Sequence, residues 1–113
     1  EKIQQAVLNI VNNAIQAIGK HHRITLQTRI SSNKNINGKL IKLAAKISII
    51  DDGPGIPANI QDTLFYPMVS GRPNGTGLGL SIAQTLINQH HGKLSCHSRP
   101  GHTKFVILLP LTQ

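Results

Sequence analysis

An amide-rich segment near the start of the chain offers the first candidate chemistry. Residues 4–14 read QQAVLNIVNNA, and Asn9 and Asn13 are four positions apart, so on a helix they project from one stripe. Their side-chain oxygens could coordinate a hard cation such as Mg²⁺ together with its waters. Alternatively, both amides hydrogen-bond the neighbouring backbone, because buried amides need partners. The segment alone favours neither interpretation.

A carboxylate followed by two glycines forms the second candidate. Residues 51–57 read DDGPGIP and follow an apolar run. An acid at the end of a strand can accept a hydrogen bond from a ligand where glycine backbone permits a close approach. A Pro/Gly turn with an Asx cap explains such a string equally simply and is the commoner origin.

A glycine-rich segment that opens a helix is the third candidate. Residues 75–81 read GTGLGLS. Backbone N–H groups there can face an anion, and a helix N-terminus adds positive potential. No strand precedes the segment and no Gly-Lys-Ser/Thr follows, which excludes the dinucleotide and P-loop fingerprints. A flexible loop with a helix start is the alternative.

The elements that position these candidates follow from periodicity and turn residues. We expect helices at 3–18, ended by Gly19, and at 78–90, capped by Gly92, with a short helical segment at 60–65. Strands are expected at 23–30, 40–50, 93–98 and 104–109, the last two forming a hairpin across Pro100-Gly101. Residues 31–39 (SSNKNINGK) read as a turn-rich connection, 51–57 as a turn and 67–76 as a long loop. The order predicts an α+β fold, a two-layer sandwich with helices on one face of a mixed, mostly antiparallel sheet.

Composition limits the class of protein. The chain has 113 residues with 39% hydrophobic, one cysteine and a net charge of +8. We therefore expect a single domain over 1–113 without a membrane span or disulfide, in the cytoplasm. The basic excess lies in residues 1–50, on two expected strands and their connection. A solvated sheet edge explains it, and a docking surface for an acidic partner is the alternative. Three aromatic residues offer no stacking platform for nucleic acid.

The order and spacing of the three candidates resemble the ATP-binding catalytic domain of sensor histidine kinases. That family belongs to the superfamily that also contains Hsp90-type, gyrase and MutL ATPases. The helix of Asn9 and Asn13 is similar to its N box, 51–55 to its first glycine box, Phe65 to its F box and 75–79 to its second glycine box. Residues 64–72 (LFYPMVSGR) and 100–103 (PGHT) are similar to nitrogen-regulation sensor kinases of the NtrB type. The resemblance covers essentially the whole chain and implies a Bergerat-type ATP-binding fold.

The resemblance implies ATP and Mg²⁺ as ligands and a role for each matched residue. Asp51 would accept a hydrogen bond from the adenine amino group, Gly55 would leave room for the base, and Thr103 would line the adenine end. Asn13, helped by Asn9, would hold Mg²⁺ against the triphosphate, and these two asparagines are the catalytic candidates. The other nucleotide-binding candidates are Gly53, Ile56, Phe65, Arg72, Gly75, Thr76, Gly77, Leu78, Gly79, Leu80 and Lys93.

Some of these candidates act through the backbone or through a mobile segment. The resemblance makes 67–76 a lid that carries Arg72 near the phosphates, and makes 75–80 a source of backbone donors. Lys93 directly follows a helix end, so a structural role for it is at least as well supported as a nucleotide contact.

The residue at position 9 bears on the type of reaction. The ATPase branch carries a water-activating Glu there, whereas an Asn cannot act as a general base at neutral pH. The resemblance then implies transfer of the γ-phosphoryl group to a histidine on a separate dimerisation domain, which, like a sensor domain, we expect to lie outside these 113 residues. The histidines at 21, 22, 90 and 91 lack the context of an acceptor motif and read as solvated turn residues.

The resemblance also implies partners. These are the phosphoacceptor domain of the same kinase, an NtrC-type response regulator and a PII-type regulatory protein. We expect the isolated domain to be monomeric, with no nucleic-acid or membrane partner. The alternatives are an ATP-hydrolysing or serine-kinase member of the superfamily, or a non-catalytic basic module that binds proteins or nucleic acid.

Overall fold

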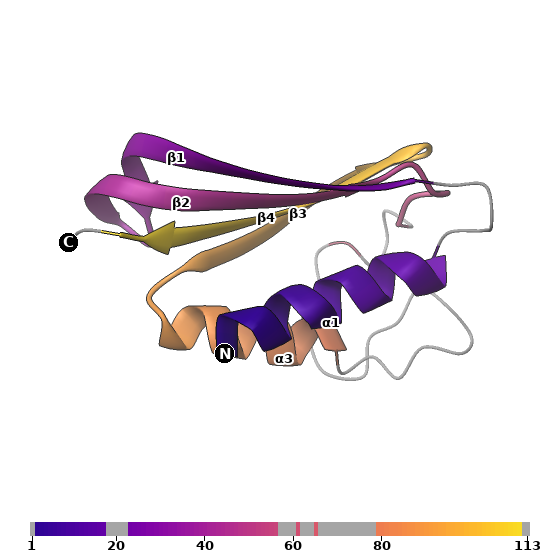
Figure 1. Ribbon diagram of the computed structural model, residues 1–113, viewed down its shortest axis with the longest axis horizontal. Helices are drawn as coiled ribbons and strands as arrows, with labels where there is room; N and C mark the ends of the chain where they lie inside the picture. Colours follow the sequence, from indigo (N-terminus) through magenta and orange to yellow (C-terminus); the bar gives the residue numbers. More distant parts are fainter. Residues whose placement is uncertain (1, 18–22, 57–60, 62–64, 66–78, 112–113) are drawn as a thin grey trace.

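Two helices lie against one face of a four-stranded sheet (Figure 1). The computed structural model describes residues 2–17, 23–56, 61, 65 and 79–111. The elements in chain order are α1 (Lys2–Ala17), β1 (Ile24–Ile36), β2 (Lys39–Asp51), α3 (Gly79–Gln89), β3 (Lys93–Arg99) and β4 (His102–Pro110). The sheet order is β1-β2-β4-β3, with every described pair antiparallel. The expected two-layer sandwich is confirmed.

The core lies between the helices and the inner face of β2, β4 and β3. In α1, Ala6, Ile10 and Ala14 recur at helical spacing and are fully buried. In the central strand β4, Phe105 and Ile107 point to the same face because they are two positions apart. The main core cluster comprises Ala6, Ile10, Ile49, Leu80, Ala83, Ile87, Leu94, Phe105 and Ile107.

The hairpin of β1 and β2 is longer than the sequence predicted. The expected connection at 31–39 is wrong, because residues 31–36 continue β1 and pair with 39–44 of β2. Only Asn37 and Gly38 form the turn, both with positive φ (53° and 84°), as a tight two-residue hairpin requires. The polar residues of this segment tolerate strand geometry because β1 is an edge strand that faces solvent.

Most of the helix-facing side of the edge strand β1 is exposed to solvent. Ile24, Leu26 and Ile30 share one face, as the alternation predicted, but only Ile24 packs against the core. Leu26 and Ile30 are 55% and 66% exposed, because β1 is the edge strand farthest from the helices (Figure 1). The basic residues at 29, 34, 39 and 42 are exposed, as expected of a solvated edge.

The end of α3 is capped differently from the expectation. The N–H of Gly92 donates to the Ile87 carbonyl and that of His91 to the Asn88 carbonyl, which is the Schellman pattern. The left-handed residue of this motif is therefore His91 (φ 62°) and not Gly92. Gly92 is needed for another reason, since a Cβ there would lie 2.6 Å from the Leu108 carbonyl oxygen.

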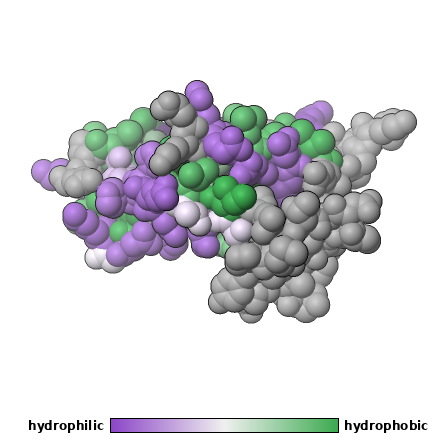
Figure 2. Space-filling model, turned by 90° about the horizontal axis from the view of Figure 1, so that it is seen from below, coloured by the Kyte–Doolittle hydropathy of each residue, from purple (hydrophilic) through white to green (hydrophobic). Residues whose placement is uncertain are grey.

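Both helices direct one end toward the place where β2 ends. The C-terminal half of α1 lies below that end of the sheet, and α3 runs the opposite way, so its N-terminus points there too (Figure 1). The outer surface of the two helices mixes hydrophobic and hydrophilic side chains (Figure 2), with Leu8, Ile15 and Ile82 exposed. Within the described residues, no helix has the length and apolarity needed to span a membrane.

Candidate functional site

A row of polar side chains crosses the inner face of the sheet at the end of β2. Thr103 on β4 is in register with Asp51 on β2 and with Ser98 on β3. Residues directly opposite in antiparallel strands point to the same face, so the three side chains line up side by side. Asp51 and Thr103 are only 4% and 3% exposed. A buried carboxylate and two hydroxyls thus lie at the edge of an otherwise apolar face.

The loop that follows Asp51 is held close to this row. The Asp51 carboxylate accepts a hydrogen bond from the Gly53 N–H at 2.9 Å, the Asx arrangement that the sequence offered as an alternative. The Gly53 carbonyl in turn accepts the N–H of Gly101, also at 2.9 Å. The first glycine box is therefore fastened to the turn between β3 and β4.

Gly55 shows why this loop needs glycine. Its φ is 89°, and a Cβ would lie 2.8 Å from the Arg99 carbonyl oxygen and 2.9 Å from its carbonyl carbon. Glycine is thus required here by conformation and by the close approach of the β3–β4 turn. Room for a base at Gly55 stays a prediction.

Two residues that sequence reasoning missed complete this arrangement. The Ser98 Oγ accepts the Ile56 N–H at 2.8 Å and lies 2.7 Å from the Thr103 Oγ1. The Gln61 amide donates to the Ile56 carbonyl at 2.8 Å and reaches the Ser98 carbonyl at 3.4 Å. The signal for Ser98 was available, because a two-residue Pro100-Gly101 turn places position 98 opposite position 103.

The two asparagines of α1 lie on one stripe, as predicted. Asn9 and Asn13 are both half-buried, on the flank of the stripe formed by Ala6, Ile10 and Ala14. The Gln5 amide donates to the Asn9 Oδ1 at 2.8 Å. This partner follows from the same i, i+4 spacing, and the contact orients the Asn9 amide along the helix.

The remaining described candidates lie near the end of β2, where the polar row is, or in the core. Phe65 is half-buried and packs edge-on against Phe105, with ring centroids 6.2 Å apart and an angle of 73° between the rings. The Leu80 side chain is buried in the core, which leaves its backbone at the start of α3. Arg72 and residues 75–78, as well as the expected lid at 67–76, lie outside the described residues.

Lys93 lies apart from this group. It is exposed at the first position of β3 and in register with Leu108, whereas the polar row crosses β3 at Ser98. The two positions are five residue steps apart on an extended strand, roughly 17 Å. The structure therefore does not bring Lys93 to the row.

Cys96 lies next to the row on β3 and is in register with Phe105. Burial, together with the nearby negative charge of Asp51, raises the pKa of its thiol from 9.0 to about 12. Because the thiolate is the reactive form, Cys96 is a packing residue at neutral pH and not a nucleophile.

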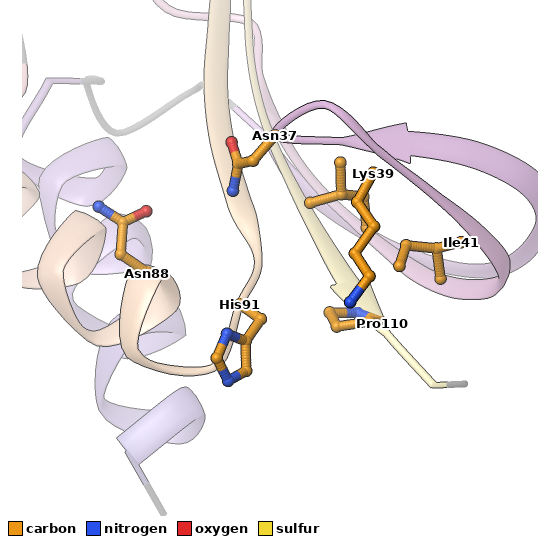
Figure 3. Close-up of a pocket in the computed structure, with 7 residues that line it drawn as sticks. Asn37, Lys39, Ile41, Asn88, His91 and Pro110 are labelled. Carbon is orange, nitrogen blue, oxygen red and sulfur yellow. The ribbon is translucent and has the colours of Figure 1, made fainter. Parts of the chain in front are cut away.

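A hollow lies at the other end of the sheet from the polar row. It has a volume of about 270 Å³ and is lined by the β1–β2 turn, the end of α3 and Pro110 (Figure 3). The Asn37 amide donates to the Gly92 carbonyl at 3.1 Å, which ties the turn to the helix end. None of the predicted site residues lines this hollow.

The fold agrees with one family of ATP-binding domains. The chain belongs to the histidine kinase-, DNA gyrase B- and HSP90-like ATPase family, whose model matches residues 1–113. Among solved structures, the chain resembles the catalytic domain of histidine kinase ThkA (29% identity, TM-score 0.80, covering 99% of this chain and 69% of that one). It also resembles the mycobacterial sensor histidine kinase MprB (27% identity, TM-score 0.73, covering 94% and 70%).

Curated relatives define the type more narrowly. The chain is 58% identical to the sensory histidine kinase/phosphatase NtrB of Vibrio alginolyticus and 54% identical to that of Escherichia coli O157:H7. Each match covers 98% of this chain and 32% of the relative. These similarities confirm the predicted resemblance to the catalytic domain of NtrB-type sensor kinases. The chain spans about a third of the length of these relatives.

Proposed function

We propose that this domain binds ATP with Mg²⁺ at the end of the sheet and donates the γ-phosphoryl group to a histidine of a separate domain in a two-component sensor kinase of nitrogen regulation. The observation that carries the proposal is the buried Asp51 carboxylate in register with Thr103. The relatives named NtrB support the type of kinase, over the third of their length that this chain matches.

The base would bind at the polar row. A buried carboxylate is an acceptor for the amino group of adenine, and a neighbouring hydroxyl can serve the adjacent ring nitrogen. Gly53 and the Gly55–Ile56 segment would border the base, with Phe65 beside them. The Phe65 ring already packs on Phe105, so it would extend the apolar floor of the core toward the ligand.

The phosphate end would use α1 and the start of α3. The half-buried amides of Asn9 and Asn13 offer oxygen ligands of the kind that Mg²⁺ accepts. The Asn9 Oδ1 accepts one hydrogen bond from Gln5, which leaves it a second lone pair. Mg²⁺, when bound, neutralises charge on the phosphates. The N-terminus of α3 at Gly79 and Leu80 adds positive potential on the same side. We propose that Arg72 and residues 75–78 complete the phosphate end of the site.

The chemistry of position 9 favours transfer over hydrolysis. An amide cannot take a proton from water at neutral pH, and the contact with Gln5 holds the Asn9 oxygen as an acceptor. Phosphoryl transfer then depends on positioning and charge neutralisation, with the nucleophile supplied by another domain. Lys93 has no part in this proposal.

The proposed partners follow from the type of kinase. They are the phosphoacceptor domain of the same kinase, an NtrC-type response regulator and a PII-type regulatory protein. We place the protein in the cytoplasm and the isolated domain in a monomeric state.

Transfer to a histidine is the direct test. The domain, mixed with the phosphoacceptor domain of its own kinase and Mg²⁺-ATP, should give a phosphorylated product that is labile in acid and stable in alkali, as a phosphoramidate is. The domain alone should hydrolyse ATP at a barely detectable rate. Rapid hydrolysis by the domain alone would instead assign it to the ATPases of the family, and binding of ATP without any transfer would contradict the proposed reaction.

The metal site is tested by Asn13→Ala. Calorimetric titration with ATP should show that this variant loses most of the affinity gained on adding Mg²⁺, because one of its oxygen ligands is gone. Affinity for adenosine should stay nearly unchanged, since the base is held by other residues. Asn12→Ala is the matched control, because Asn12 is an exposed residue on the same helix. An equal Mg²⁺ effect in wild type and Asn13→Ala would remove Asn13 from the metal site.

A further inference from the structure

Ser98 has no part in the function proposed above, yet its side chain lies at the centre of the contacts around the polar row. Its Oγ accepts the Ile56 N–H at 2.8 Å and lies 2.7 Å from the Thr103 Oγ1. Its carbonyl receives the Gln61 amide, which also holds the Ile56 carbonyl. Ser98 therefore touches both sides of the proposed base site, the loop after Asp51 and the hydroxyl beside Asp51.

Either hydroxyl can be the donor in the contact between Ser98 and Thr103, and the other contacts of Ser98 favour one direction. A serine hydroxyl has one proton and two lone pairs. The Ile56 N–H occupies one lone pair of Ser98. Among the described residues, the acceptor that remains in contact with the Ser98 proton is the Thr103 Oγ1. When Ser98 donates to Thr103, the proton of Thr103 is directed away from Ser98, toward the Asp51 side of the row.

This assignment fixes which group of the row accepts a hydrogen bond from a ligand and which group donates one. Asp51 presents an acceptor, and Thr103 next to it presents a donor. Adenine carries an amino donor beside the N1 acceptor and therefore matches the pair. Guanine carries the O6 acceptor beside the N1–H donor and presents the reverse order. A site built to hydrogen-bond one pattern rejects the other, because buried polar groups are left unpaired.

The geometry points to Ser98 as a positioning residue for base selection: by donating to Thr103 it holds the Thr103 proton toward the base, and by accepting from Ile56 it fixes the facing loop. This inference rests on the proposed binding of ATP at the row. Ser98 itself need not touch the nucleotide, since its Oγ proton and one lone pair are engaged within the protein.

The test compares three nucleotides across a set of variants. Dissociation constants are measured for ATP, GTP and purine riboside triphosphate, which keeps N1 but lacks the amino group. In Ser98→Ala the Thr103 hydroxyl can rotate and accept from guanine N1–H. We expect ATP and purine riboside triphosphate to weaken roughly tenfold and GTP to stay within about twofold, so the preference for ATP over GTP falls roughly tenfold.

The control variants separate positioning from a general effect on folding. Ser95→Ala removes a half-buried hydroxyl from the other face of β3 and should leave the preference unchanged. Ser98→Thr keeps a hydroxyl and should restore the preference. Thr103→Val keeps the shape of the side chain without the hydroxyl and should reproduce the loss, and the Ser98→Ala/Thr103→Val double variant should lose no more than either single variant.

Each outcome decides the inference. If Ser98→Ala weakens all three nucleotides equally, Ser98 has only a structural role and the inference is overturned. If Ser98→Ala does not fold, Thr103→Val decides, because an unchanged preference in that variant also overturns it. A wild-type domain that binds ATP with no preference over GTP overturns this inference alone, whereas one that binds no ATP overturns the proposed function itself.

Discussion

Replacing Asp51 by asparagine should weaken ATP binding roughly 10- to 100-fold, the effect of losing a charged hydrogen bond of about 1.5–3 kcal/mol in a buried site. The Asp51 carboxylate is buried and accepts the Gly53 N–H. Asparagine keeps an oxygen for that internal contact, so the loop should hold its conformation. It places an amino group where the second carboxylate oxygen would accept the adenine amino group. Calorimetric titration with ATP measures the loss.

The neighbouring acid provides a matched control for this variant. Asp52 is exposed, and its carboxylate accepts the backbone N–H of Arg23 at 2.7 Å. Asp52→Asn removes the same charge from the adjacent position and keeps an acceptor for Arg23. Its affinity for ATP should stay close to that of the wild type. If Asp51→Asn also keeps the wild-type affinity, Asp51 does not contact the base.

Replacing Gly55 by alanine should have the largest effect on the fold. The residue has φ 89°, and a Cβ would meet the Arg99 carbonyl at 2.8 Å. Conformational strain of about 1 kcal/mol then adds to about 1–3 kcal/mol for forcing an atom into packed backbone. We expect a decrease of about 2–4 kcal/mol in the free energy of unfolding in urea, together with loss of ATP binding, because the first glycine box must move away from the row.

A substitution at Gly38 measures the conformational strain without the steric contact. It has nearly the same φ, 84°, but a Cβ there would meet nothing within 4 Å. Gly38→Ala should therefore cost only the strain, about 1 kcal/mol, and leave ATP binding unchanged. Equal stability of Gly38→Ala and Gly55→Ala would show that the contact with Arg99 does not constrain the loop.

The parts of the fold that sequence reasoning predicted are those with a local signal. The helical periodicity of the apolar residues over 3–18 predicted α1 and placed Asn9 and Asn13 on one stripe. The pair Pro100-Gly101 predicted the closing hairpin, which the structure extends by one residue of β3 and three of β4. These signals succeed because the interactions behind them join residues close in the chain.

The parts that sequence reasoning missed depend on partners far apart in the chain. Residues 31–35 are polar on both faces, so no alternation indicated a strand, and only pairing with β2 makes them one. Gly92 was expected to cap α3. Position 92 instead requires glycine because a Cβ there would meet the carbonyl oxygen of Leu108 on β4. Gln61 and Ser98 matter because register and loop packing bring them to Ile56.

The antiparallel register between β2 and β4 has a consequence for the order in which the molecule assembles. Each hairpin, β1–β2 and β3–β4, can form from local contacts around its own turn. Pairing Asp51 with Thr103 closes a segment of about fifty residues, which carries a larger entropic cost and delays this contact. Because Asp51 comes from one hairpin and Thr103 and Ser98 from the other, neither hairpin alone contains a base site. A nucleotide bound across the row would contact both hairpins and would therefore stabilise their association.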